Sequence, residues 1–295
     1  MNERSIVLDM AQEALPLTSE DWGDLNRVEE ARPPSLRQFD QIPMRGADLL
    51  RQVKLIAPSF AGQRIAFVGD SDGTSLLLGL LSVRGGPRPG ELHLLDFDAR
   101  LLAAANRLAR RHGFADILQT WHYNMFDPIP LLLKGSCDWF YTNPPYGQSN
   151  NGESARLFVA RGGECVHADG HGGIVLPDDV SRPWTVGAMR ATLEMLGSNG
   201  WSERLRYAAA HQYRLDDDPH LTSDLVVVDR TASEDALPLP YVGRRVMFEE
   251  IPHFYGRQTP QPYPRYVRAD GTLDYNWDQQ GEQNDERGYA VGRVA

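Results

Sequence analysis

Residues 137–147, with the sequence CDWFYTNPPYG, provide the first constraint on the fold. The stretch begins as an apolar run of β-forming residues, which Asn143-Pro144-Pro145-Tyr146-Gly147 then interrupts. Neither proline can donate a hydrogen bond to a strand ladder, and each fixes its own φ angle. We therefore predict a buried strand that ends in a rigid, polar turn with an aromatic tip.

This turn suits a reaction at an amino nitrogen. The side-chain oxygen of Asn143 and the backbone carbonyl of Pro144 can both accept N–H bonds, which would aim the nitrogen lone pair outward. Tyr146 can lie against a base or a cation. The alternative interpretation is a turn that only closes a sheet strand. Because the complete NPPYG follows an apolar strand, we predict that Asn143, Pro144 and Tyr146 are catalytic.

A second polar loop follows an earlier strand. Residues 64–69 (RIAFVG) predict a short buried strand, and the loop 69–75 (GDSDGTS) leads directly into an apolar helix over 76–81. A strand, a small acidic loop and a helix N-terminus in this order are typical of the first turn of a nucleotide-binding sheet.

The next strand and helix complete a βαβ unit. A strand is expected at 91–96 (ELHLLD) and a helix at 98–111, with Asp98 as its N-cap and Gly113 just beyond its end. Asp96 then stands at the tip of the second strand, where such folds bind the ribose hydroxyls of a nucleoside. The alternative for Asp96 is a solvated acid at a strand end.

The rest of the chain continues the alternation and then changes. Further strands are expected at 117–123 and 173–176, and further helices at 45–55 (ended by Pro58), 157–166 and 185–196. Two strands at 205–215 and 224–229, joined by an acidic turn at 216–218, predict an antiparallel hairpin at a sheet edge. This order predicts an α/β, Rossmann-like class I methyltransferase fold with a mostly parallel seven-stranded sheet. A dinucleotide dehydrogenase would show G-x-G-x-x-G, which the loop after Gly69 lacks.

Three regions differ in composition. Residues 1–37 predict an irregular lead-in, residues 38–232 the transferase domain, and residues 233–295 a Pro- and Tyr-rich tail or lid.

Composition limits the compartment and the partners. The 295 residues are 41% hydrophobic and 24% charged, with a net charge of −10. The N-terminal sequence lacks the pattern of a signal peptide, and no apolar stretch approaches the length of a membrane span, so we expect a cytoplasmic protein. An acidic chain favours cationic ligands such as polyamines over nucleic-acid phosphates.

Cysteines and histidines give no metal-binding pattern. Cys137 and Cys165 lack ligand spacing and are expected to be buried thiols, and the histidines are scattered. We expect no metal at the site.

Several motifs, taken in order, resemble the branched-chain polyamine synthases. They are Asp40-Gln41, GDSDGTS at 69–75, LLDFDARLL at 94–102, NMFDPIP at 124–130, NPPYG at 143–147 and RLFVARG at 156–162. The resemblance covers roughly residues 38–230. It differs from the family pattern at Ser71 and Asn143, where the family carries aspartates, and at Gly73, where it carries a leucine.

The resemblance implies the transfer of an aminopropyl group from decarboxylated S-adenosylmethionine to a polyamine nitrogen. The donor would be contacted by Gly69, Asp70, Ser71, Gly73, Asp96, Phe97, Asn124 and Met125. For Asn124, a turn-forming role is an equal alternative.

Two other functions stay open. NPPY is also the usual form of the catalytic turn in S-adenosylmethionine-dependent methyltransferases that act on adenine or glutamine nitrogen. A catalytically silent member of the fold could bind a nucleoside or a polyamine as a sensor.

The acidic loop separates these functions. A carboxylate at Asp70 or Asp72 beside the donor's own carboxylate would repel it, whereas a decarboxylated donor presents only an ammonium group. Asp72 could also accept the proton of a cationic acceptor amine, and we predict that it is catalytic. Its alternative role is the N-cap of the next helix.

Overall fold

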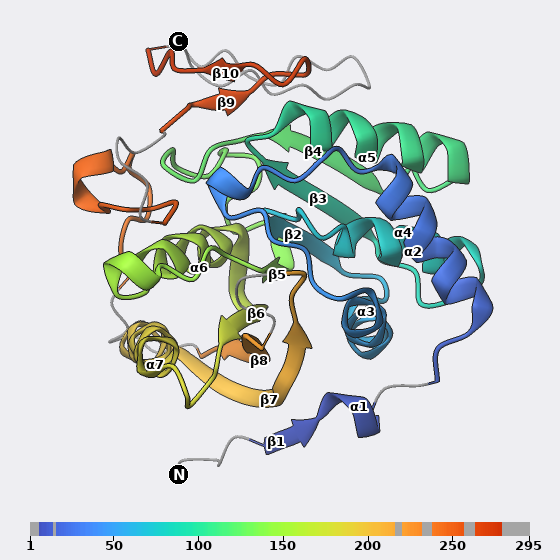
Figure 1. The fold of residues 1–295 in the computed structure, drawn as a ribbon, viewed down its shortest axis with the longest axis horizontal. Coiled ribbons are helices and arrows are strands. Elements are labelled where there is room, and N and C mark those ends of the chain that lie inside the picture. The colour runs from blue at the N-terminus through green and yellow to red at the C-terminus, as the bar shows by residue number, and fades with distance from the viewer. Residues whose placement is uncertain (1–5, 14–15, 216–219, 232–237, 257–262, 279–295) are drawn as a thin grey trace.

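An eight-stranded mixed sheet, in the order β1-β7-β8-β6-β5-β2-β3-β4, forms the centre of the computed structural model (Figure 1). The structure describes residues 6–13, 16–215, 220–231, 238–256 and 263–278. The strands are β1 (Ile6–Asp9), β2 (Arg64–Val68), β3 (Glu91–Asp96), β4 (Leu118–His122), β5 (Cys137–Thr142), β6 (Val166–Pro177), β7 (Trp201–Gln212) and β8 (Thr222–Arg230). A separate antiparallel pair consists of β9 (Tyr266–Val267) and β10 (Leu273–Asp274).

Helices cover both faces of the sheet. They are α1 (Met10–Glu13), α2 (Ser19–Ala31), α3 (Gly46–Phe60), α4 (Thr74–Val83), α5 (Ala99–His112), α6 (Glu153–Cys165) and α7 (Pro183–Ser198). Short 3-10 turns are η1 (Arg37–Phe39), η2 (Gln148–Asn150) and η3 (Phe248–Glu250). Figure 1 shows α6 and α7 on one side and α3, α4 and α5 on the other.

The period-two alternation of the central strands builds two cores. Ile65 and Phe67 of β2 pack with α3, α4 and α5, whereas Ala66 and Val68 pack with α6 and α7. All four side chains are fully buried, as expected for a parallel strand that is covered on both faces. Because β2, β3, β4 and β5 are parallel, the polar loops that follow them meet at one edge of the sheet.

The predicted fold class is confirmed, with one extra strand. Strand β8 pairs antiparallel with both β6 and β7, and the pair of β7 and β8 is the predicted hairpin. Residues 6–9, expected to be irregular or helical, instead form β1, which pairs in parallel with β7. The hairpin is therefore not at the sheet edge, and the sheet has eight strands and not seven. The acidic turn at 216–218 lies outside the described residues.

Other local predictions need correction. Residues 19–31 of the expected irregular lead-in form α2, which begins with a capping box between Thr18 and Asp21. Helix α3 continues through Pro58 to Phe60, so this proline lies in the last turn and does not end the helix. The boundaries of the three predicted regions stay a prediction. No helix among the described residues is long and apolar enough to cross a bilayer.

The described parts of the C-terminal region pack against the sheet domain. Ile251, Phe254 and Val267 are fully buried in the core that includes α6. The described part of this region is therefore packed, and its role as a tail or lid stays a prediction. The aromatic and aliphatic residues of this region have no helical or strand periodicity, so the sequence does not predict how they pack. In the structure they fill separate spaces in one core.

Arg161 of α6 ties this region to the rest of the chain. Its side chain is fully buried. The guanidinium donates to the carbonyl oxygens of Met125 (3.0 Å), Tyr241 (2.9 Å) and Arg244 (2.8 Å) and pairs with Glu164 at 2.7 Å. Since guanidinium can donate in several directions at once, a single side chain satisfies three carbonyls and a buried carboxylate.

We predict that Arg161→Ala lowers the free energy of unfolding by about 3 to 5 kcal/mol, because it leaves the Glu164 charge and three carbonyls buried without their donor. Denaturant unfolding measures this loss. Arg190→Ala is the control, since Arg190 is 75% exposed and faces Glu194 at 3.8 Å across one turn. An equally small effect in both variants would contradict the structural role of Arg161.

Candidate active site

Two adjoining pockets open at the edge of the sheet where β2, β3, β4 and β5 end. Four residues line both pockets, namely Asp40, Ser71, Asn143 and Pro145. Ser71 comes from the loop after β2, and Asn143 and Pro145 from the turn after β5. Asp40 comes from a segment before the sheet, directly after η1. The pockets therefore share a wall at which a group held in one can reach a group held in the other.

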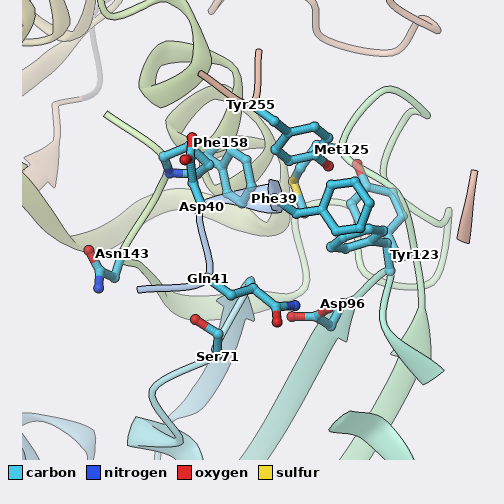
Figure 2. Close-up of a pocket in the computed structure, with 13 residues that line it drawn as sticks. Phe39, Asp40, Gln41, Ser71, Asp96, Tyr123, Met125, Asn143, Phe158 and Tyr255 are labelled. Atoms are coloured by element: carbon cyan, nitrogen blue, oxygen red, sulfur yellow. The ribbon is translucent and has the colours of Figure 1, made fainter. Parts of the chain in front are cut away.

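The first pocket is narrow and aromatic, with a cavity volume of about 50 Å3. Its other lining residues are Phe39, Gln41, Gly69, Asp96, Phe97, Tyr123, Met125, Phe158 and Tyr255. The rings of Phe97 and Tyr255 stack at 6.1 Å, and Phe39 contacts the edges of both rings. Figure 2 shows the Asp96 carboxyl group on the opposite side of this pocket, beside the Gln41 amide.

Gly69 is placed where the sequence predicts. It lines the first pocket with φ at +70°, and a Cβ atom at this position would lie 3.0 Å from the ring of Phe158. Both the left-handed backbone and the close approach of α6 favour glycine.

Asp70 does not face either pocket. Its carboxylate accepts hydrogen bonds from the backbone nitrogens of Thr74 (2.9 Å) and Ser75 (2.8 Å), which are the first residues of α4. Burial, with the nearby charge of Asp72 adding to it, raises the pKa of Asp70 to about 7. In this structure Asp70 caps the helix, so its predicted contact with a donor is not seen.

Asp72 also lines neither pocket, and it holds the turn after β5. It is 2% exposed, and its Oδ1 accepts from the backbone nitrogen of Met44 at 2.8 Å. Its Oδ2 accepts from the Asn143 side-chain nitrogen at 2.7 Å. The alternative role as helix N-cap is wrong, because Gly73 occupies that position with φ at +83°. Gly73 lines neither pocket.

The bond to Asp72 fixes the orientation of the Asn143 amide. A carboxylate can only accept, so the amide nitrogen of Asn143 must face it. The Asn143 oxygen is then left as the acceptor that can meet an N–H group in the shared wall of the two pockets.

Asp96 lines the first pocket as predicted. It is 5% exposed, and its carboxylate accepts from the backbone nitrogen of Asp98 at 2.9 Å. Burial, and then the negative charge of Asp98, raise the pKa of Asp96 to about 7. Phe97 and Met125 line the same pocket.

Asn124 has a supporting position. Its amide nitrogen donates to the Arg265 carbonyl at 2.6 Å, and its amide oxygen accepts from the backbone nitrogen of Phe126 at 3.1 Å. Both ends of the amide are therefore engaged, and the residue lines neither pocket. Asn124 anchors the segment before β9 and makes the turn that was its alternative role.

The second pocket is wider, with a cavity volume of about 310 Å3. Pro144 and Tyr146 line it together with Trp184 and Tyr213, and the catalytic role expected of the first two stays a prediction. The hydroxyl of Tyr146 bonds to that of Tyr213, which bonds to Ser223 Oγ at 2.7 Å. This series of hydrogen bonds holds the Tyr146 phenol in place. Among the described residues, no Lys or Arg lines either pocket.

Sequence reasoning missed several residues that line the first pocket, and most of them lie outside the strand ends. They are Phe39, Asp40, Gln41, Tyr123, Pro145 and Phe158, with Tyr255 from the C-terminal region. The Asp40-Gln41 pair was a signal, because it is part of the family resemblance. The described part of the chain has no group of three or more His, Cys, Asp or Glu side chains that could hold a metal ion. A metal-free site stays a prediction.

Comparison with known proteins identifies relatives of this arrangement. Residues 24–179, more than half of the chain, match the family described as Branched-chain polyamine synthase A C-terminal domain. An uncharacterised protein of Methanocaldococcus jannaschii is 31% identical over 109 residues, which are 37% of this chain and 25% of that protein.

Solved structures share the fold. The branched-chain polyamine synthase of Thermus thermophilus, in complex with N4-aminopropylspermidine and 5'-methylthioadenosine, superposes with a TM-score of 0.61 at 20% identity. The match covers 74% of this chain and 66% of that enzyme. A candidate RNA methyltransferase from Pyrococcus horikoshii matches with a TM-score of 0.54 at 11% identity, over 73% of this chain and all of that one.

We predict that Asp96→Asn stabilises the protein at pH 8 and has a smaller effect at pH 4.5. An aspartate has a pKa near 3.9 when unfolded, and burial raises that of Asp96 to about 7. Between these values the folded state binds more protons, so the stability contributed by Asp96 is lost as pH rises through 7. Asparagine has no ionisable group, so the variant does not lose this stability as pH rises.

Denaturant unfolding at the two pH values measures the difference, which should be about 1 to 3 kcal/mol. Asp169→Asn, at an exposed position, is the control. A gain that is identical at both pH values would contradict the raised pKa.

Proposed function

Because this chain belongs to the branched-chain polyamine synthase A C-terminal domain family, we propose that it transfers an aminopropyl group from decarboxylated S-adenosylmethionine to a polyamine nitrogen. The observation that carries the proposal is the shared wall of the two pockets at Asn143. Both pockets contain carboxyl groups, and neither is lined by a described Lys or Arg. Such pockets favour cationic ligands, and both of these substrates are cations.

The first pocket is the proposed donor site. The Asp96 carboxylate can accept hydrogen bonds from ribose hydroxyls, and the aromatic rings of Phe39, Phe97 and Tyr255 suit an adenine. This pocket is narrow, with a cavity volume of about 50 Å3. The adenine would therefore have to displace or join the stack of Tyr255 on Phe97.

The second pocket is the proposed acceptor site. The Asn143 oxygen and the Pro144 carbonyl would accept N–H bonds from the amine and direct its lone pair at the donor's propyl carbon. The new C–N bond forms as the C–S bond breaks, and the C–S electron pair stays on sulfur, which leaves as 5'-methylthioadenosine. Positioning of this kind converts a bimolecular reaction into an effectively unimolecular one. Tyr146 would lie against the cationic chain of the polyamine.

The sequence attributes the preference for a decarboxylated donor to Asp70 and Asp72, whereas we attribute it to Asp40. Asp70 and Asp72 are engaged in hydrogen bonds and line neither pocket, whereas Asp40 lines both pockets. A donor carboxylate near Asp40 would be repelled by several tenths to a few kcal/mol. An ammonium group in the same place would be attracted.

N-methyl transfer is the second candidate. The observation that favours it is the fixed Asn143 amide, since an amide oxygen suits the neutral amino group of adenine or glutamine as well as it suits an amine.

We predict that decarboxylated S-adenosylmethionine binds at least tenfold more tightly than S-adenosylmethionine, because the acidic pockets repel the carboxylate of the latter. Isothermal titration of the two donors under the same conditions measures this ratio, and a turnover assay with spermidine checks the transfer. If the carboxylated donor binds tenfold more tightly, methyl transfer becomes the better proposal.

We predict that Asn143→Ala reduces turnover by about tenfold to a thousandfold while the donor dissociation constant stays nearly unchanged. Asn143 lies in the wall that the two pockets share and is proposed to orient the amine, whereas the proposed ribose contact is Asp96. Asn276→Ala, at an exposed position outside both pockets, is the control. A matched loss of donor affinity would show that Asn143 acts in binding.

Asn143→Asp separates the two candidate reactions. A carboxylate beside a cationic polyamine should retain or improve aminopropyl transfer, whereas it should impair methylation of a neutral adenine amino group. Assays with spermidine and with an adenine-containing oligonucleotide compare the two. Lower polyamine activity together with unchanged adenine activity would contradict the proposed function.

A further inference from the structure

Asp40 occupies the wall between the two pockets, and the function described so far gives it a part in donor preference but none in the transfer step. It follows η1 and adopts a left-handed backbone, with φ at +56°. A non-glycine residue in this region is uncommon, and aspartate is one of the few that tolerates it. This conformation is kept by the flanking residues, because Phe39 is buried and the Gln41 side chain accepts from the backbone nitrogen of Leu36 at 2.8 Å.

The carboxyl group of Asp40 differs from the other acids around the site. Asp70, Asp72 and Asp96 each accept hydrogen bonds from the backbone of the protein. Among the described residues, none donates a hydrogen bond to the Asp40 carboxylate, and no described cation pairs with it. It is also the one acid of these four that lines both pockets.

The surroundings of Asp40 suit a group that exchanges a proton with a cation. The titratable groups that line the pockets together with it are Asp96, Tyr123 and Tyr255 in the first pocket and Tyr146 and Tyr213 in the second. Burial raises the pKa of Asp40 to about 6. The group is therefore ionised at neutral pH and yet more basic than an exposed aspartate.

We propose that Asp40 is the general base that removes a proton from the acceptor amine before the amine attacks the donor. This inference rests on the proposed function. The secondary ammonium group of the polyamine gives one proton to the Asp40 carboxylate, which becomes a neutral acid. The freed lone pair forms the C–N bond, the C–S bond breaks towards sulfur, and the product keeps its remaining proton as a tertiary ammonium. Asp40 then returns its proton to solvent.

The division of roles at the turn follows from this assignment. Asn143 can orient the amine but cannot take its proton, since an amide is not a base near neutral pH. The Asp72 carboxylate contacts Asn143 and the backbone of Met44, so it orients the amide and does not reach into the pockets. Asp40 supplies the missing proton acceptor.

Asp40→Asn is the test variant, because asparagine tolerates the left-handed backbone and has nearly the same shape. With saturating decarboxylated S-adenosylmethionine and spermidine at pH 7, we expect kcat to fall about a hundredfold or more. The loss should shrink as pH rises from 7 to 9.5, since solution then supplies more of the free amine. In the wild type, kcat should fall as pH drops through about 6, where Asp40 becomes protonated.

Asp169→Asn, at an exposed position, is the matched control and should keep the wild-type profile. Asp40→Gly, which also accepts a positive φ, replaces the test variant if thermal denaturation shows that the asparagine variant is unfolded.

Two results would overturn the assignment of Asp40 as the general base, and they differ in whether the wild-type protein is active. Wild-type protein without turnover on any polyamine removes the proposed function and the base together. An active wild type whose Asp40→Asn variant keeps full turnover, or loses the same factor at every pH, removes the base and leaves aminopropyl transfer in place.

Discussion

The hydrogen bond between Asp72 and Asn143 is the constraint on which the site depends. It joins the loop after β2 to the turn after β5, and the second oxygen of the same carboxylate holds the backbone of Met44 before α3. A carboxylate that is almost fully buried must find donors within the protein, because no water is available to replace them. Three separate segments are therefore fixed relative to one another by one side chain. The orientation of the Asn143 amide, and with it the acceptor that faces a substrate, follows from this requirement.

The acids at this edge of the sheet have separate tasks because they have different partners. Asp70 satisfies the first amides of α4, Asp72 orients the Asn143 amide, and Asp96 faces the first pocket. Burial raises the pKa of each of these groups. Asp40 alone among them combines a place in both pockets with an unengaged carboxylate. A site of this kind attracts cations and can take up a proton near neutral pH.

The sequence predicts those parts of the site that the order of strands determines. Asp96 is the last residue of β3 and Asn143 directly follows β5. In a parallel sheet these strand ends must lie on one edge, so the places of both residues follow from topology. The direction of a side chain is less predictable. Asp70 and Asp72 are two residues apart in one loop, and the geometry of the α4 N-terminus and of the Asn143 amide decides what each carboxylate contacts.

The other parts of the site and of the sheet depend on long-range packing, which the sequence does not predict. Tyr255 enters the first pocket from a region without periodicity. Phe158 belongs to the RLFVARG motif, but only the folded chain places its ring beside Gly69 in this pocket. Strand β1 pairs with β7, nearly 200 positions further along the chain, as in Ile6 with Leu205. Asp40 belongs to a recognisable pair of residues, but only the folded chain places it between two pockets.

The most direct test of this account is a crystal structure of the protein with 5'-methylthioadenosine and spermidine bound together. We expect the ribose hydroxyls on the Asp96 carboxylate, and the reacting amine within hydrogen-bonding distance of the Asn143 side-chain oxygen and of Asp40. A nucleoside bound away from Asp96, or a polyamine bound outside the second pocket with Asn143 unoccupied, would contradict it.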